Sequence, residues 1–181
     1  MMKIMSYINQ ADFDRPSIQI ALDLIYISNK ERLVEEKVKL GFPKVLDVRP
    51  EITDDPNTFI PVTVDELFDM RYATHGSDGF MYRRLPLSII DRVPGHLINP
   101  PHFPFKTSEV LDQINEQLNT QLTMGDLQER EYTKAEGVMN LYAHPHSLVW
   151  IGETEMAVNW GQPLVPIVEI TYLSGFNEFV A

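Results

Sequence analysis

The chain contains no cysteine, and this absence excludes several kinds of site at once. Without a thiol the protein can form no disulfide, hold no thiolate-bound zinc ion and use no cysteine nucleophile. The chain also lacks a glycine cluster, so it has neither a phosphate-binding P-loop nor a dinucleotide-binding motif. The G-x-S-x-G motif of many serine hydrolases is missing too. No sequence motif therefore assigns a chemistry to this protein.

Positive charge is also scarce. The chain has 15 Lys and Arg residues against 26 Asp and Glu residues, for a net charge of −11. Nucleic acids and anionic membranes both attract clustered cations, so we expect this acidic chain to bind neither. No apolar run approaches the ~20 residues that span a bilayer, and the first 16 residues lack the apolar stretch of a signal peptide. We expect a soluble protein that is made in the cytoplasm.

Apolar residues, in contrast, are abundant enough to build a core. Of the 181 residues, 44% are hydrophobic, which suits one domain of ordinary size or two small ones. We expect an N-terminal arm at residues 1–16 and a single module over 17–181. If the module is divided, the boundary should lie in the proline-rich segment 94–104.

The clearest predicted element is an amphipathic helix at about 107–119. Its apolar residues recur at the three-and-four spacing that places them on one helix face. They are Val110, Leu111, Ile114 and Leu118. The Thr107 hydroxyl is suited to cap the first turn, and Asn119 is a poor helix former at the other end. A second turn is predicted from Thr123 to Asp126, where the sequence resembles a capping box.

The N-terminal part predicts a strand and a second helix. Apolar residues alternate along 18–24, which favours a strand with one buried face, although a helix over 18–27 fits the same residues. The capping-box sequence from Ser28 to Glu31 predicts a helix at about 29–39.

Most of the remaining chain predicts strands, so the expected fold is α+β, with the 107–119 helix packed on an antiparallel sheet. The predicted strands are 44–49, 58–64, 80–87, 137–143, 147–151, 154–160 and 165–172. Pro61 should place its strand at a sheet edge, because proline donates no ladder hydrogen bond. Residues 151–153 should form a tight turn between two paired strands, and residues 65–70 could form a helical turn.

Four histidines flank the predicted central helix and are the candidates for a metal site. They are His96, His102, His144 and His146. The last two have the spacing that places both rings on one side of an extended strand, as some metal sites require. No HExxH motif or third ligand in register supports such a site, and loop histidines are usually surface residues. We therefore predict no metal and no cofactor, with a small metal-dependent enzyme as an alternative.

Large aromatic residues are the candidates for an interface. Trp150 and Trp160 bracket the predicted hairpin, and Phe176 and Phe179 lie close to the end of the sequence. Aromatic residues in such places are usually core residues or interface anchors. A ligand-binding module that uses Trp150, Trp160 and Tyr142 is a second alternative.

Three motifs carry a resemblance to a known class of protein. They are T-S-E-V-L-D-Q-I-N from Thr107, L-T-x-x-D-L from Leu122 and S-L-V-W-I-G-E-T-E from Ser147. In this order they resemble modules of virion structural proteins from tailed bacteriophages. The sequences N-T-F-I-P-V-T-V from Asn57 and F-M-Y-R-R-L from Phe80 resemble the first half of such a module. The resemblance covers roughly Lys30–Trp160.

This resemblance implies a non-enzymatic structural component of a phage particle. Its partners would be other virion proteins, in a homo- or hetero-oligomer, and its location would be the virion after synthesis in the host cytoplasm. Capsid decoration, neck and tail positions are all compatible with the motifs. The resemblance transfers no catalytic residue to this chain.

Overall fold

The computed structural model describes residues 13–30, 32–46, 55–64, 79–90, 96–133, 138–159 and 161. It confirms the predicted α+β class, because helices and antiparallel sheets are both present. The α-helices are α2 (Ser17–Asn29) and α4 (Leu111–Leu118), and 3-10 turns cover Glu35–Lys37, Leu87–Ile89 and Thr107–Val110. Among the described residues, no helix is long and apolar enough to cross a membrane.

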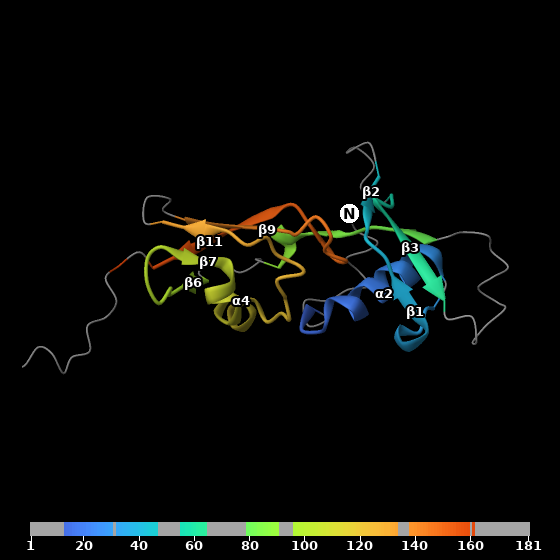
Figure 1. The fold of residues 1–181 in the computed structure, drawn as a ribbon, viewed down its shortest axis with the longest axis horizontal. Coiled ribbons are helices and arrows are strands. Elements are labelled where there is room, and N and C mark those ends of the chain that lie inside the picture. The colour runs from blue at the N-terminus through green and yellow to red at the C-terminus, as the bar shows by residue number, and fades with distance from the viewer. Residues whose placement is uncertain are drawn as a thin grey trace, which may run out of the picture.

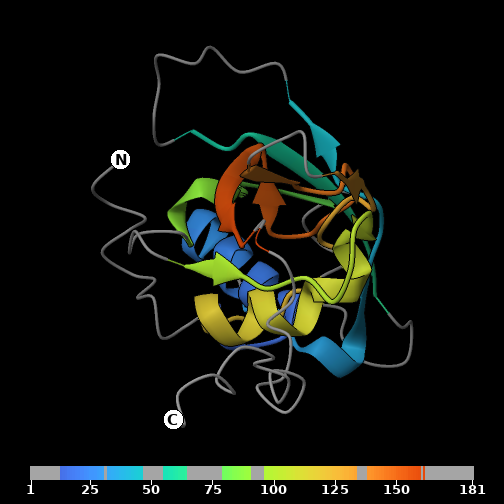
Figure 2. The same cartoon turned by 90° about the vertical axis from the view of Figure 1, so that its left-hand side faces the viewer.

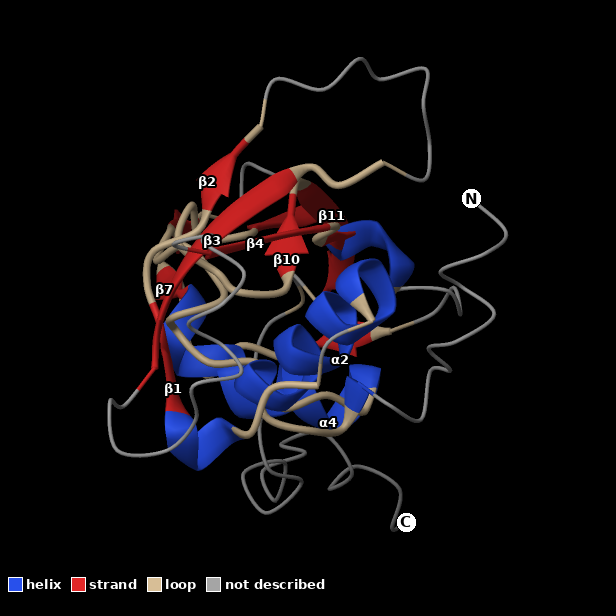
Figure 3. Cartoon of the chain, turned by 90° about the vertical axis from the view of Figure 1, so that its right-hand side faces the viewer, coloured by secondary structure: helices blue, strands red, loops and turns tan. Residues whose placement is uncertain are grey.

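The strands are short and belong to several small sheets. They are β1 (Val38–Leu40), β2 (Lys44–Val45), β3 (Thr58–Val64), β4 (Gly79–Tyr82), β5 (Leu85–Pro86), β6 (Leu97–Ile98), β7 (Phe105–Lys106), β8 (Glu131–Tyr132), β9 (Val138–Tyr142), β10 (Trp150–Ile151) and β11 (Glu153–Val158). The molecule is elongated, with β1 to β4 and α2 towards one end and α4, β6, β7 and β11 towards the other (Figure 1). Views along the long axis show both helices on the same side of the strands (Figures 2 and 3).

The first helix corrects two predictions. Residues 18–24 form part of α2 and not a strand, because Ile20, Ala21, Leu24 and Ile25 share one helix face and are all buried. The helix ends where a second helix was predicted to begin. Lys30 adopts a left-handed conformation (φ 64°), and its N–H donates to Tyr26 O at 2.7 Å. The predicted helix at 29–39 is therefore wrong, and strand β1 begins at Val38.

Strand β3 is the centre of the first sheet, so the prediction that Pro61 would place it at a sheet edge is wrong. It pairs antiparallel with β4 on one side and with both β1 and β2 on the other. Pro61 is accommodated because it lies opposite the gap between β1 and β2. Its carbonyl accepts from Gly41 N at 2.8 Å, and its missing N–H faces the same gap.

The predicted central helix is confirmed. It begins as the 3-10 turn Thr107–Val110 and continues as α4, and Asn119 ends it in a left-handed conformation (φ 51°). Its apolar face is buried through Val110, Ile114 and Leu118. The N-cap differs from the prediction, because Lys106 occupies that position and the Thr107 hydroxyl donates to Gln128 O at 3.1 Å.

Helix α4 lies beside the sheet of β6, β11 and β9 (Figure 1). Strands β9 and β11 are antiparallel, and β6 joins β11 in parallel. The Gln113 side chain bonds both backbone groups of Asn99 at 2.9 Å, so the helix covers the open edge of β6. The predicted tight turn at 151–153 does not join paired strands, because β10 pairs in parallel with β5.

The remaining predictions differ in outcome. The strand at 58–64 is confirmed with its bounds, whereas that at 80–87 is divided into β4, β5 and a 3-10 turn. Phe13 was assigned to the arm but is buried at 2% exposure, and residues 1–12 lie outside the described residues. The predicted elements at 65–70 and 165–172 also lie outside them.

Candidate protein-binding groove

The loop 143–149, between β9 and β10, is where the two ends of the molecule are joined. Tyr82 at the end of β4 donates its hydroxyl to Leu148 O at 2.6 Å, and Leu85 N donates to Val149 O at 2.8 Å. On the other side, His144 N donates to Asp126 O at 2.7 Å. The β4–β5 segment and the turn at 123–126 therefore fix this loop from two sides.

A buried arginine also contacts the loop. Arg84 is only 2% exposed, and its guanidinium donates to Pro145 O at 3.1 Å and to Ser147 O at 2.9 Å. Its Nε donates to Thr58 Oγ1 at 2.9 Å. Burial lowers the pKa of Arg84, because removal from water disfavours the charged form. Its three neutral acceptors, two carbonyls and one hydroxyl, offset part of the cost of burying the guanidinium.

A buried carboxylate holds the loop from the opposite side. Asp126 accepts from Thr123 N at 3.1 Å and from Thr123 Oγ1 at 2.9 Å, which confirms the predicted turn from Thr123 to Asp126. Its second oxygen accepts from Ser147 Oγ at 2.9 Å. Arg84 and Asp126 therefore both contact Ser147, the first through its carbonyl and the second through its hydroxyl.

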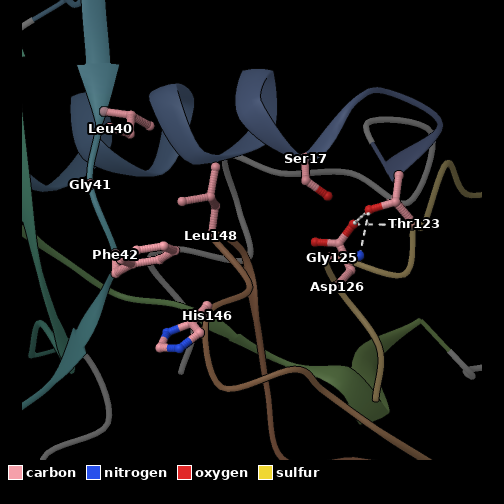
Figure 4. Close-up of a pocket in the computed structure, with 9 residues that line it drawn as sticks. All are labelled: Ser17, Leu40, Gly41, Phe42, Thr123, Gly125, Asp126, His146 and Leu148. Atoms are coloured by element: carbon pink, nitrogen blue, oxygen red, sulfur yellow. Dashed lines mark hydrogen bonds between the residues drawn. The ribbon is translucent and has the colours of Figure 1, made fainter. Parts of the chain in front are cut away.

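A groove lies between this loop and the segment Leu40–Phe42 (Figure 4). Its volume is about 360 Å³. It is lined by Ser17, Leu40, Gly41, Phe42, Thr123, Gly125, Asp126, His146 and Leu148. The Asp126 carboxylate is already occupied by hydrogen bonds, so the wall is mainly apolar, with the His146 ring and the Ser17 hydroxyl as polar groups.

The rim of the groove carries an exposed aromatic side chain. Phe42 is 72% exposed, and its ring lies 4.8 Å from the ring of His146, centroid to centroid. Val45, on the adjacent strand β2, is also 72% exposed. Large apolar side chains that remain exposed beside a groove are typical of sites that bind another surface.

The local backbone explains why Phe42 projects outward. Leu40 pairs with Val62 and Lys44 pairs with Phe59, so three residues of one strand lie opposite two of β3. This extra residue is a β-bulge. A bulge, a proline at position 43 and lysines on short strands all discourage further strand pairing at an edge. The surface therefore offers side chains rather than a free backbone ladder.

The predicted histidine cluster is only partly assembled. The rings of His144 and His146 lie 5.5 Å apart, centroid to centroid. His102 lies elsewhere, with Nε2 3.2 Å from a Glu109 oxygen, and His96 precedes β6. Within the described part of the chain, no three His, Cys, Asp or Glu residues are placed to hold a metal ion. The backbone N–H of His146 donates to His144 Nδ1 at 3.2 Å.

The predicted aromatic interface residues also fall in different places. Trp150 is a core residue at 1% exposure, and its ring lies 5.3 Å from that of Phe13. The guanidinium carbon of Arg130 lies over the Tyr142 ring, 4.3 Å from the centroid of that ring. Trp160, Phe176 and Phe179 lie outside the described residues, and their interface role stays a prediction.

Sequence reasoning missed Phe42 and Val45. The signal was present in K-V-K-L-G-F-P-K-V from Lys37, where an aromatic residue stands between glycine and proline in a lysine-rich stretch of an acidic chain. Glycine and proline together indicate a break in a strand, and an aromatic residue at such a break is not covered by a neighbouring strand.

Comparison with known proteins identifies the chain at the level of a family. No curated protein and no solved structure matches it. Residues 10–180 match the model of a family described as a family of unknown function, DUF7941. Because this match spans nearly the whole chain, the protein belongs to the DUF7941 family.

Proposed function

We propose that this protein is a non-enzymatic structural component of a tailed-phage virion that binds neighbouring virion proteins. The observation that carries the binding part is the groove with Phe42 exposed at its rim, beside the exposed Val45 of strand β2. The virion part rests on the resemblance of the motifs between Thr107 and Trp160.

The groove is suited to binding because its far wall is held in place before any partner arrives. Arg84, Tyr82 and Asp126 fix the loop that carries His146 and Leu148 through buried hydrogen bonds. A preformed wall loses little conformational entropy on association, so more of the contact energy remains as affinity. Phe42 is the expected anchor, because interface hot spots are enriched in aromatic residues beside well-packed pockets.

The presence of the protein in purified particles tests the virion part. Particles from a lysate of the source should be banded on a density gradient and their proteins quantified by mass spectrometry. We expect a fixed copy number relative to the major capsid or tail protein, retained after a high-salt wash. A non-structural phage protein from the same lysate is the control. Depletion of our protein together with that control would contradict the proposal.

A matched pair of variants tests the groove itself. Phe42→Ala should reduce incorporation into particles, because it removes the exposed anchor while changing little of the core. Tyr26→Ala is the control, because Tyr26 is also an exposed aromatic residue (46%) but lies on α2 outside the groove lining. Equal incorporation of the two variants would count against the groove as the binding surface.

A further inference from the structure

We infer that the groove receives an arginine side chain from a partner protein, with the guanidinium group at Asp126 and the methylene stem across Leu148. This inference rests on the proposed function, because it names the chemistry that the partner presents to the same groove. It follows from the charge, the polarity and the size of the groove (Figure 4).

The negative charge of Asp126 has no cationic partner in the described part of the chain, where no lysine, arginine or histidine forms an ion pair with it. The residue is buried at 2% exposure, and its side chain accepts only from neutral donors, which belong to Thr123 and Ser147. These three hydrogen bonds suit the ionised form and leave one of its roughly four acceptor positions open. A buried charge is costly unless it is paired, so a cation at Asp126 would be stabilised there.

The groove contains no positive charge that could fill this role. None of its nine lining residues is lysine or arginine. Lys39 precedes the lining residue Leu40 on strand β1, and successive side chains of a strand point to opposite faces, so Lys39 faces away from the groove. The net charge of −11 on the whole chain also favours a basic partner over an acidic one.

The polarity of the groove changes from one side to the other. In Figure 4, Leu40 and Phe42 lie on one side, Asp126 and Ser17 lie on the other, and Leu148 lies between them. The complementary side chain has an apolar stem and a charged head, as lysine and arginine do. The volume of about 360 Å³ is at the lower end of the roughly 300–1,000 Å³ range of ligand pockets, which suits one long side chain.

Arginine fits this groove better than lysine does. A guanidinium group is more weakly hydrated than an ammonium group, so it loses less on entering a buried site. Its five N–H donors are spread over a plane, which lets it donate to Asp126 and to the Ser17 hydroxyl together. Within the described residues, the Ser17 hydroxyl has no hydrogen-bond partner, so it can accept such a bond.

Binding of a peptide to the full-length protein tests this inference. The probe is a peptide of sequence GLRLG with blocked ends, and the control peptide carries citrulline, which has the shape of arginine without its charge. Titrations followed by two-dimensional NMR of the protein give both dissociation constants. We expect the arginine peptide to bind at least about tenfold more tightly, because hydrogen bonds between charged groups contribute more than neutral ones. Equal affinities would overturn the inference.

A matched pair of variants tests whether Asp126 is the source of the preference. Asp126→Asn should abolish the preference for the arginine peptide, whereas Glu116→Gln should keep it, because Glu116 is exposed on α4 and does not line the groove. Each variant changes the net charge from −11 to −11 + 1 = −10. General attraction between a basic peptide and an acidic protein is therefore the same in both. The same preference in both variants would overturn the inference.

A second pair decides the question if Asp126→Asn does not fold. Ser17→Arg and Gln19→Arg both place a cation in the first turn of α2, but Gln19 is exposed and does not line the groove. The new side chain of Ser17→Arg can pair with Asp126, so this variant should lose peptide binding and melt about 2 °C or more above Gln19→Arg. Equal peptide binding or equal melting temperatures of the two variants would contradict the inference.

These outcomes separate the inference from the proposed function. If Phe42→Ala reduces incorporation into particles but the protein shows no preference for the arginine peptide, the chemistry of the partner alone is wrong. If the protein prefers the arginine peptide through Asp126 but is absent from particles, the virion role alone is wrong.

Discussion

Replacement of Tyr82 by phenylalanine tests how the central loop is held. The Tyr82 ring is completely buried, and its hydroxyl donates to Leu148 O at 2.6 Å. Tyr82→Phe keeps the ring packing and leaves the Leu148 carbonyl without this donor. The cost of an unsatisfied buried acceptor predicts a loss of about 1–3 kcal/mol in the free energy of unfolding at pH 7.

The same variant should also change how stability depends on pH. Burial raises the pKa of Tyr82 well above its usual range, although the nearby Arg84 charge acts in the opposite direction. In the unfolded chain this tyrosine ionises near about pH 10. Above that pH the unfolded state binds fewer protons than the folded state, so the wild-type protein loses about 1.4 kcal/mol per pH unit through Tyr82. The variant lacks this loss, and the stability difference should shrink by about 1.4 kcal/mol by pH 11.

Urea denaturation followed by circular dichroism at pH 8, 10 and 11 measures this difference. The other tyrosines are common to both proteins, so their ionisation cancels in the comparison. A stability difference that stays constant from pH 8 to pH 11 would refute the assignment of a buried, un-ionised Tyr82. A difference below about 0.5 kcal/mol at pH 8 would instead refute the contribution of its hydrogen bond.

Three further substitutions test other parts of the structure. Arg84→Met should lower the free energy of unfolding by about 2–4 kcal/mol in urea titrations, because it leaves buried acceptors unpaired. A smaller loss would mean that burying the charge costs as much as its hydrogen bonds contribute. Gly79→Ala should lower the free energy of unfolding by about 3 kcal/mol or more in thermal melts, because the new Cβ would overlap Ile60 O. A melting transition like that of the wild-type protein would show that β3 and β4 can separate locally. In the same melts, Ile114→Ala should lower the free energy of unfolding by about 2–5 kcal/mol, and the control Glu116→Ala should lower it by less than about 0.5 kcal/mol. Similar losses for the two variants would mean that α4 does not bury its apolar face.

The parts of the fold that sequence predicted are those where several local patterns agree. The α4 helix has an apolar face, an acidic first turn and a stop at Asn119, so no alternative competes with it. The segment 18–24 fits both a strand and a helix, and only the burial of Ala21 and Ile25 against the rest of the fold decides between them. Local sequence could not supply that information.

The candidate site was less predictable because it depends on contacts between distant segments. Trp150 is buried partly by Phe13, which is 137 residues earlier in the chain (150 − 13). Glycine and proline beside Phe42 indicate a break in the strand, but its exposure depends on the bulge opposite β3, whose register is set by residues 58–64. The histidines at 144 and 146 are close in sequence and in space, whereas His102 contacts Glu109 and His96 precedes β6.

The loop 143–149 has a consequence for the order in which the protein can fold during synthesis. Arg84 bonds a carbonyl 63 residues later, and Tyr82 bonds one 66 residues later. Strands β5 and β6 likewise find their parallel partners only in β10 and β11. A nascent chain that has not passed residue 150 therefore cannot complete either end of the core. Because such long-range closure is slow, we expect the emerging N-terminal half to depend on chaperones until the loop is made, and shorter fragments to be cleared by proteases rather than to accumulate.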